Sequence, residues 1–342
     1  MNYWWLVPIF SGVSFCLTAI IRRYAIARSI LDIPNARSSH SEATPRGGGV
    51  AIVIAFLTAF MIFCIEDQLS FTSFLGVAVP GAFVAIIGFM DDHGHIKARW
   101  RLLGHFLATA WALFWLGGLP PIVAFGVFFD LSWFGHLLGV LYLVWMLNLY
   151  NFMDGIDGLA SVEAICACLG ACLLYWLLGL ETLVWGPLLL AATVAGFLYW
   201  NFPPARIFMG DAGSGFLGVV LGVLSLQAAL VSPPMLWAWL ILLGVFIVDA
   251  TYTLFRRLLR GEKVYEAHRS HAYQFASRRV GKHLPVTIAV GAINIFWLLP
   301  ISVCVARFGL DGTLGVILAY APLILLAYKL RAGDLESPAV KN

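Results

Sequence analysis

Apolar runs long enough to cross a lipid bilayer recur from one end of this sequence to the other. A transmembrane helix needs about 17–25 predominantly apolar residues, because each residue adds only roughly 1.5 Å along the helix axis. We therefore expect an all-α polytopic membrane protein in which residues 1–342 form a single integral membrane domain. The sequence predicts eleven helices, near 4–22, 47–65, 72–90, 102–118, 135–151, 159–178, 185–200, 213–231, 236–255, 285–305 and 313–330.

The composition excludes a soluble globular chain. Of the 342 residues, 61% are hydrophobic and only 11% are charged, whereas a soluble domain has about 25% charged residues. The six cysteines all fall within apolar runs, at spacings that suggest neither a zinc site nor a disulfide framework. The first apolar run precedes its arginines, Arg22 and Arg23, and is long for the core of a signal peptide. We interpret it as a retained first helix.

Polar residues are distributed unequally between the two sides of the predicted bundle. With the N-terminus outside, every Lys and Arg except Arg307 falls on the cytosolic side, as the positive-inside rule requires. The outer connections are short, apart from an apolar stretch at 119–134 that we interpret as an outer loop, with partial re-entry as an alternative. The asymmetry predicts a site that faces the cytosol. Five polar segments contribute to that side: 34–49, 89–101, 148–158, 201–215 and 256–279.

The segment NFMDGIDG (151–158) places two carboxylates, Asp154 and Asp157, at the end of an apolar helix. One charged residue at the centre of a bilayer-spanning helix costs about 2.5–3.5 kcal/mol on insertion scales. Ionisable residues inside a membrane protein are therefore interpreted first as lining a functional site.

Two further acidic motifs lie at predicted helix ends on the same side. Asp91 and Asp92 are adjacent, so one can face a metal or substrate while the other is turned away. In GDAGSG (210–215), glycines let backbone N–H groups approach an anion at a helix start. Asp211 would repel bare phosphate there, and the arrangement makes sense with Mg²⁺ between them. Solvated helix-end acids and an ordinary N-cap are the structural alternatives.

The last cytosolic segment is strongly basic and contains the sequence HRSH. His268 and His271 are three residues apart, a spacing that could serve a metal, but Arg269 between them favours anion binding. His93 and His95 also look metal-like, and we interpret them as surface residues. Asp249, inside an apolar run, either pairs with a basic neighbour or lines the cleft, and the sequence leaves both open.

Together these segments combine carboxylates, glycine-rich turns and basic side chains at one membrane surface. Such a combination fits Mg²⁺-assisted transfer of a phosphate-containing group onto a lipid acceptor. A secondary transporter is the main alternative, but transporters place charges near the bilayer midplane and often show inverted repeats. Here the acids gather at helix ends and the sequence has no convincing internal repeat, which favours an enzyme.

The order of the motifs resembles that of a known enzyme family. Asp-Asp at a helix end, NFMDGIDGL, FMGDAGS and a His-containing last loop resemble the polyprenyl-phosphate N-acetylhexosamine-1-phosphate transferases, glycosyltransferase family 4, over nearly the whole chain. SSHSEATPRGGG and YEAHRSHAYQ are similar to the WbpL-type branch, which starts O-antigen synthesis. Relatives that form lipid II carry a triple histidine in the last loop, where this chain has HRSH.

This resemblance implies that undecaprenyl phosphate attacks the β-phosphate of a UDP-N-acetylaminosugar and that UMP is released. The sugar stays open among UDP-FucNAc, UDP-QuiNAc and UDP-GlcNAc, and a WecA-type GlcNAc-1-phosphate transferase is the alternative within the family. Mg²⁺ is the implied cofactor, with Mn²⁺ as an alternative. The implied partners are the two substrates and membrane lipid but no nucleic acid, and a homodimer is left open. The implied location is the bacterial cytoplasmic membrane.

The resemblance also assigns roles to individual residues. Asp211 would be the chief Mg²⁺ ligand, with Asn151 as a second ligand. Asp91 would take the proton of the lipid phosphate or hold that group in line, while Asp92 and Asp154 would support the metal and phosphate geometry.

The remaining implied roles concern the substrates. Phe208 would stack on uracil and Asp157 would contact its edge. A lysine that some relatives carry in the first cytosolic loop is absent, and Arg37 or Arg46 is the expected substitute. The stretch 262–275 is expected to choose the sugar. The other implied substrate contacts are Asn151, Gly155, Asn201, His268, Arg269, His271, His40 and Thr44.

Overall fold

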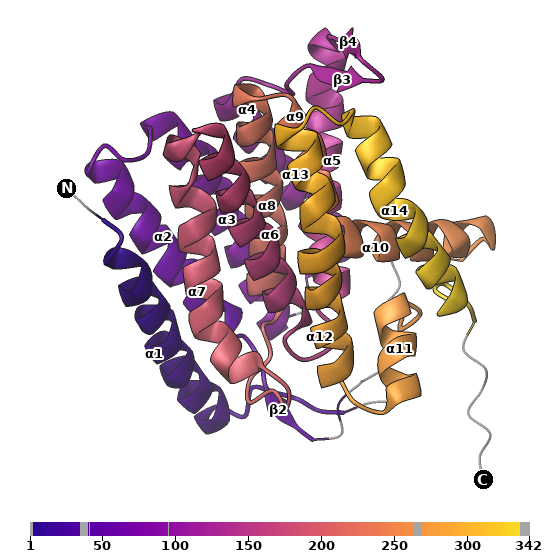
Figure 1. The fold of residues 1–342 in the computed structure, drawn as a ribbon. Coiled ribbons are helices and arrows are strands. Elements are labelled where there is room, and N and C mark those ends of the chain that lie inside the picture. Colours follow the sequence, from indigo (N-terminus) through magenta and orange to yellow (C-terminus); the bar gives the residue numbers. More distant parts are fainter. Residues whose placement is uncertain (1–2, 35–39, 41, 95, 263–267, 336–342) are drawn as a thin grey trace.

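The computed structural model describes residues 3–34, 40, 42–94, 96–262 and 268–335, and in these ranges the chain is mainly helical (Figure 1). The α-helices are α1 (Leu6–Ala27), α2 (Gly49–Ile65), α3 (Phe71–Gly94), α4 (Ala98–Leu116), α5 (Ser132–Met153), α6 (Leu159–Leu178), α7 (Trp185–Asn201), α8 (Asp211–Val231), α9 (Pro234–Leu242), α10 (Gly244–Leu259), α11 (Ala272–Val280), α12 (Leu284–Ile293), α13 (Leu299–Arg307) and α14 (Gly312–Lys329). Two short strand pairs, a 3₁₀ turn and a π-helical turn complete them: β1 (Leu31–Asp32) with β2 (Thr44–Pro45), β3 (Ile122–Ala124) with β4 (Val127–Phe129), Glu181–Leu183 and Asn294–Leu298.

Within the described ranges, eight helices are long and apolar enough to cross a membrane, and a ninth span is added if α9 and α10 count as one. The π-helical turn joins α12 and α13 into one of these spans. Each of the eleven predicted segments coincides with helix, and α2 and α4 lie between the longer spans in the chain. The prediction of an all-α polytopic membrane protein is confirmed, whereas length and composition do not establish eleven spans.

The predicted helix at 236–255 is wrong as a single straight span. The chain bends by 74° between α9 and α10, and α10 lies across the bundle and projects past α14 (Figure 1). α10 ends with arginines beside large exposed apolar side chains, a combination that suits the boundary between lipid and water. The residues concerned are Arg256, Arg257, Phe255, Leu258 and Leu259.

The first turn of α8 packs directly against the last part of α3. A Cβ added at Gly88 of α3 would lie 2.5 Å from the carbonyl carbon of Asp211. This distance is too short for a real Cβ atom, so only glycine fits here without a shift of the backbone. α8 is also buried along most of its length. Close packing between backbones therefore sets where α8 begins, and with it the position of Asp211.

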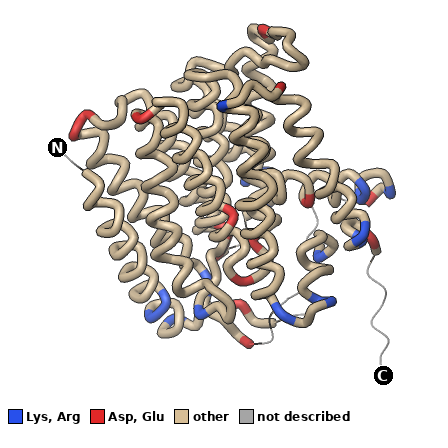
Figure 2. The backbone as a smooth tube through the Cα atoms, viewed as in Figure 1, with Lys and Arg blue, Asp and Glu red and all other residues tan. Residues whose placement is uncertain are grey.

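The two ends of the bundle differ in charge. Figure 2 shows Lys and Arg gathered mainly toward the end where α1 finishes and α11 lies. At the opposite end, the stretch 119–134 contains the antiparallel hairpin β3–β4, with Ile122 opposite Phe129. The hairpin projects away from the helices (Figure 1), so the structure supports a loop rather than the re-entrant alternative.

We predict that Gly88→Ala destabilises the protein, because the added methyl group must displace the first turn of α8. Overpacking of this kind costs about 1–3 kcal/mol, and we expect a lower transition temperature in thermal unfolding of the detergent-solubilised protein. Gly94→Ala in the same helix is the control, since a Cβ there meets no atom within 4 Å among the described residues. Equal transition temperatures for the two variants would contradict the close packing described above.

Candidate active site

A cavity of about 290 Å³ lies at the charged end of the bundle, where α3 and α5 end and α8 begins. All five polar segments predicted from the sequence contribute to its lining, the last of them through Gln274. Asp32 and Ser214 also line it. Ten residues with predicted roles lie here: His40, Arg46, Asp92, Asn151, Asp154, Gly155, Asp157, Asn201, Phe208 and Asp211.

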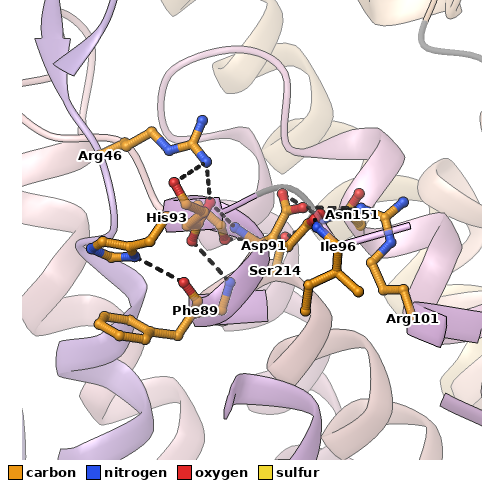
Figure 3. Close-up of polar contacts among 12 residues, drawn as sticks. Arg46, Phe89, Asp91, His93, Ile96, Arg101, Asn151 and Ser214 are labelled. Carbon is orange, nitrogen blue, oxygen red and sulfur yellow. Dashed lines mark hydrogen bonds and ion pairs between the residues drawn. The ribbon is translucent and has the colours of Figure 1, made fainter. Parts of the chain in front are cut away.

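Asp211 is the first residue of α8, and its side chain is 36% exposed toward this region. Asn151, near the end of α5, donates hydrogen bonds from Nδ2 to Asp211 Oδ1 and to Ser214 Oγ, each at 3.0 Å. Figure 3 shows Asn151 and Ser214 side by side in this network. The structure thus brings together the two residues predicted as metal ligands.

The side chain of Asp92 is only 3% exposed and caps α8 from the neighbouring helix. Its Oδ1 accepts a hydrogen bond from the N–H of Asp211 at 3.2 Å, and its Oδ2 accepts one from Ala212 at 3.4 Å. The first N–H groups of a helix have no partner within the helix and favour negative charge. Gly210 must be glycine beside this cap, because a Cβ there would lie 2.7 Å from Asp92 Oδ2.

Arg46 holds the same carboxylate from the other side. Its Nη2 donates to Asp92 Oδ1 and to the Asp92 carbonyl, each at 2.8 Å (Figure 3). Arg46 therefore lies at the cavity, as expected for one of the two candidate substitutes for the missing lysine. The other candidate, Arg37, lies outside the described residues.

Asp91 points toward α4 instead. Its carboxylate accepts a hydrogen bond from the Ile96 N–H at 2.7 Å and forms an ion pair with Arg101 (Figure 3). Nη1 of Arg101 also lies 3.6 Å from Asp211 Oδ2. Asp91 is not among the described residues that line the cavity, but its carboxylate lies beside that of Asp211, and Arg101 contacts both acids. Arg101 belongs to the predicted polar segment 89–101, but its local pattern does not show that it also reaches Asp211.

Phe208 is held by the glycine-rich turn at 44–49. Gly48 donates its N–H to the Phe208 carbonyl at 2.9 Å, and the Phe208 N–H donates to the Pro45 carbonyl at 2.8 Å. The ring of Phe208 is half-buried, and the His40 ring packs edge-on against it at a centroid distance of 4.8 Å. The turn therefore positions an aromatic ring at the cavity.

A second cavity of about 810 Å³ adjoins the first and shares His40, Asp157 and Phe208 with it. Thr44 lines this second cavity, and its hydroxyl donates to the Glu42 carbonyl at 3.1 Å. Thr44 is thus near the predicted site but outside the smaller cavity.

The residues 154–158 form a turn that is fixed mainly by its neighbours. Asp157 Oδ1 lies 3.1 Å from His283 Nδ1, and Asp157 Oδ2 accepts a hydrogen bond from the Ala205 N–H at 3.0 Å. Asn201 is buried, accepts from the Gly158 N–H at 3.0 Å and donates to the Ile207 carbonyl at 3.1 Å. Both ends of the Asn201 amide therefore serve to position backbone. His283, which lies beyond the predicted segments, was missed.

Negative charge is crowded into the cavity. Five carboxylates line it, those of Asp32, Asp92, Asp154, Asp157 and Asp211. Burial raises the pKa of Asp154 well above its ordinary value, and Asp211 and its acidic neighbours raise it further. No hydrogen bond among the described residues reaches the Asp154 carboxylate. The arrangement therefore favours the binding of a cation.

His268, Arg269 and His271 precede α11 and are not among the described residues that line either cavity. The rings of His268 and His271 stack at a centroid distance of 4.8 Å. Burial lowers the pKa of His268 to about 3, with His271 and Arg257 contributing, so His268 is neutral at pH 7. The carbonyl of Arg269 accepts a hydrogen bond from Arg278 at 3.0 Å. Residues 263–267 of the same segment lie outside the described ranges, as does His95.

The structure resolves the alternatives left open for Asp249. Its carboxylate accepts hydrogen bonds from the Ala272 and Tyr273 N–H groups at 2.9 and 3.0 Å and from the Thr253 hydroxyl at 3.0 Å. His271 Nδ1 lies 3.3 Å from the same carboxylate. Asp249 therefore caps α11 and contacts a histidine, and it is not among the residues that line the cavity.

Comparison with known proteins shows the family to which this sequence is similar. The model of the family described as glycosyl transferase family 4 matches residues 74–229, which include Asp91, Asp154 and Asp211. A probable undecaprenyl-phosphate N-acetylglucosaminyl 1-phosphate transferase from Bacillus subtilis is 32% identical over 272 residues, covering 75% of this chain and 72% of the relative. The chain belongs to glycosyl transferase family 4.

Other relatives in family 4 have related names. An undecaprenyl-phosphate alpha-N-acetylglucosaminyl 1-phosphate transferase from Thermotoga maritima is 30% identical over 294 residues, 85% of this chain and 87% of the relative. A phospho-N-acetylmuramoyl-pentapeptide-transferase from Moorella thermoacetica is 32% identical over 222 residues, 60% of this chain and 66% of the relative. The family predicted from the motifs is confirmed, and these similarities favour a transferase over a transporter.

We predict that Asp249→Ala loosens α11, because the helix loses its cap and His271 loses a buried partner. Loss of a cap costs about 0.5–2 kcal/mol, and 1.4 kcal/mol changes an equilibrium about tenfold. Tryptic cleavage at Arg278 and Arg279, followed by mass spectrometry, should therefore accelerate about tenfold.

Asp311→Ala is the matched control for this measurement. Asp311 caps α14 by accepting hydrogen bonds from the Thr313 and Leu314 N–H groups at 2.9 and 3.1 Å. Its loss should leave cleavage in α11 unchanged. Equal cleavage rates in Asp249→Ala and the unmodified protein would show that Asp249 does not anchor α11.

Proposed function

We propose that this chain transfers an N-acetylaminosugar-1-phosphate from a UDP-sugar to undecaprenyl phosphate, releasing UMP and starting the synthesis of O-antigen or a related surface polysaccharide. The observation that carries the proposal is the acidic cavity in which Asp211, Asn151 and Phe208 meet at the ends of apolar helices. The names of the Bacillus and Thermotoga relatives specify undecaprenyl phosphate and an N-acetylglucosaminyl 1-phosphate group, which supports the proposed acceptor and the proposed transferred group.

The place of the cavity suits an acceptor that is a membrane lipid. The helices that end or begin there, α3, α5 and α8, are apolar enough to span a bilayer, so the phosphate of a polyprenyl lipid can reach this depth. An oxygen of that phosphate attacks the β-phosphorus of the donor. The bond from this phosphorus to the bridging oxygen breaks, and UMP leaves with that oxygen.

This reaction does not require a strong base. A phosphate monoester is already largely ionised at pH 7, because its second pKa is about 6. Asp91 is paired with Arg101, and we assign it to holding Arg101 toward the reacting phosphates rather than to removing a proton. Arg101 and Arg46 then stabilise negative charge from two sides of α8.

The side chains at the start of α8 fit Mg²⁺ in the manner usual for phosphate transfer. No three His, Cys, Asp or Glu side chains among the described residues form a complete metal cage. Mg²⁺ is commonly held by one or two carboxylates, with substrate phosphates and water as the other ligands. Asp211 would hold the ion with Asn151 and Asp154 beside it, and Mn²⁺ could replace it. When bound, the ion supplies positive charge against the donor pyrophosphate.

We assign the uracil base of the UDP-sugar to the side of the cavity where Phe208 lies. Phe208 offers a ring face for uracil, and Asp157, fixed by His283 and Ala205, is placed near the shared wall of the two cavities. The active site would face the cytosol of a bacterial cell, with the N-terminus outside and the chain in the cytoplasmic membrane.

A WecA-type GlcNAc-1-phosphate transferase is the second candidate, because the names of the Bacillus and Thermotoga relatives specify N-acetylglucosaminyl transfer. The deciding assay incubates membranes containing the protein with undecaprenyl phosphate and radiolabelled UDP-GlcNAc, UDP-FucNAc or UDP-QuiNAc. Label should move into the lipid extract while UMP is released. The preferred donor distinguishes the two candidates, and no transfer from any donor would refute both.

We predict that the reaction needs a divalent cation and that Asp211→Asn lowers kcat by orders of magnitude. Asn keeps the size of the side chain but removes the charge that attracts the ion. Asp130→Asn, at the opposite end of the molecule, should have no effect. Normal UMP release in the presence of EDTA, or full activity of Asp211→Asn, would exclude the proposed metal site.

We predict that Phe208→Ala raises the KM for the UDP-sugar and leaves the KM for undecaprenyl phosphate nearly unchanged. Stacking of a base on an aromatic ring is worth about 1–3 kcal/mol, which corresponds to roughly a five- to 150-fold change. Phe202→Ala is the control, since Phe202 lies on the same connection, is 43% exposed and is not among the described residues lining either cavity. A rise only in the KM for the lipid would place Phe208 on the acceptor side.

A further inference from the structure

Gln274 is the one described residue of the segment 256–279 that lines the site cavity. It is the third residue of α11, and its side chain is half-buried beside the turn that carries Asp154 and Gly155. A Cβ built on Gly155 would lie 3.3 Å from Gln274 Nε2. The amide nitrogen of Gln274 therefore lies directly against this turn.

The two ends of the Gln274 amide have different surroundings. Oε1 accepts a hydrogen bond from the His271 N–H at 3.1 Å, as part of a capping box at the start of α11. A backbone N–H can only donate, so this contact identifies the oxygen end of the amide. No hydrogen bond among the described residues uses Nε2, so a neutral N–H donor remains available at the cavity.

Contacts on two sides fix the orientation of this donor. Asp249 holds the first turn of α11 through the N–H groups of Ala272 and Tyr273. The Tyr273 hydroxyl donates to the Phe152 carbonyl at 3.0 Å, and a Cβ at Gly155 would lie only 2.1 Å from that hydroxyl. A donor ordered in advance loses little conformational entropy when a ligand binds.

We propose that Gln274 selects the sugar of the donor by donating a hydrogen bond from Nε2 to the carbonyl oxygen of its acetamido group. This inference rests on the proposed function and deepens it. Phe208 suits uracil, and Asp211 with a cation suits the pyrophosphate. A neutral amide among carboxylates matches a neutral acceptor oxygen better than a phosphate. His268 and His271 then support α11 instead of contacting the sugar.

A purely structural role for Gln274 in the capping box is the rival explanation, and Gln274→Glu separates the two. Glu also serves in capping boxes, so the helix keeps its acceptor for the His271 N–H, but a carboxylate cannot donate. Its negative charge weakens binding of every UDP-sugar alike, because all share the pyrophosphate. The informative quantity is therefore the ratio of the Kd for UDP-glucose, which lacks the acetamido group, to the Kd for UDP-GlcNAc.

We expect the unmodified protein, titrated with Mg²⁺ present, to bind UDP-GlcNAc more tightly than UDP-glucose. Gln274→Glu should reduce the ratio about ten- to hundredfold, the usual effect of one lost buried hydrogen bond. Gln274→Met, which is neutral, should reduce it in the same direction. Arg279→Ala, on an exposed part of α11, should leave it unchanged.

An unchanged Kd ratio in Gln274→Glu and Gln274→Met would overturn the inference. UMP release by the unmodified protein is measured in parallel. Absence of UMP from every UDP-N-acetylaminosugar would refute the proposed function and this inference with it. Normal UMP release with an unchanged ratio would refute the role of Gln274 alone.

Discussion

The site depends on the contact between the end of α3 and the first turn of α8. Gly88 lets the two backbones approach, and Asp92 accepts hydrogen bonds from the N–H groups of Asp211 and Ala212. The residue before α8 is Gly210, which has no side chain and a φ of +78°, so the helix cannot cap itself there. The negative charge that stabilises this helix end comes from another helix. Because of this cap, Asp211 begins α8 and faces Asn151.

The carboxylates of the site differ in how many hydrogen bonds and ion pairs they already make within the protein. The Asp92 carboxylate contacts Arg46 and the N–H groups at the start of α8. The Asp91 carboxylate contacts the Ile96 N–H and Arg101. The Asp157 carboxylate contacts the Ala205 N–H and His283. Asp211 receives one hydrogen bond from Asn151, and no described residue donates one to Asp154. Among the acids of the predicted motifs, only these last two retain oxygens for a cation together with access to the cavity. Asp32 also lines the cavity, and no described residue donates a hydrogen bond to its carboxylate. The acids that resemble one another in the sequence therefore divide into those that position backbone and those that can bind a ligand.

The helical segments and the convergence of the polar segments could be predicted from the sequence. The reason is that hydropathy and motif spacing are signals that lie within short stretches of the chain. They did not predict which partner each side chain has. Arg46 and Asp92 are 46 residues apart, and Asp249 and Ala272 are 23 apart. The contacts of Arg101, His283 and Gln274 likewise join separate elements. The sequence also suggested that His268 and His271 would meet the substrate. The described cavity is lined by Gln274 instead. The reason is that α11 begins after His271, and its first turn faces the cavity.

The bend between α9 and α10 and the cap on α11 together give the buried Asp249 carboxylate its hydrogen-bond partners. A straight helix at 236–255 would have carried Asp249 into the apolar part of the bundle, where an unpaired carboxylate is costly. The 74° bend turns α10 across the bundle, and Asp249 then meets the Ala272 and Tyr273 N–H groups while it stays buried. The start of α11 supplies the hydrogen bonds that the carboxylate needs, and α10 in turn fixes α11. The polar helix α11 is thereby attached rigidly to α10. This attachment is needed to keep Gln274 against the turn at Gly155.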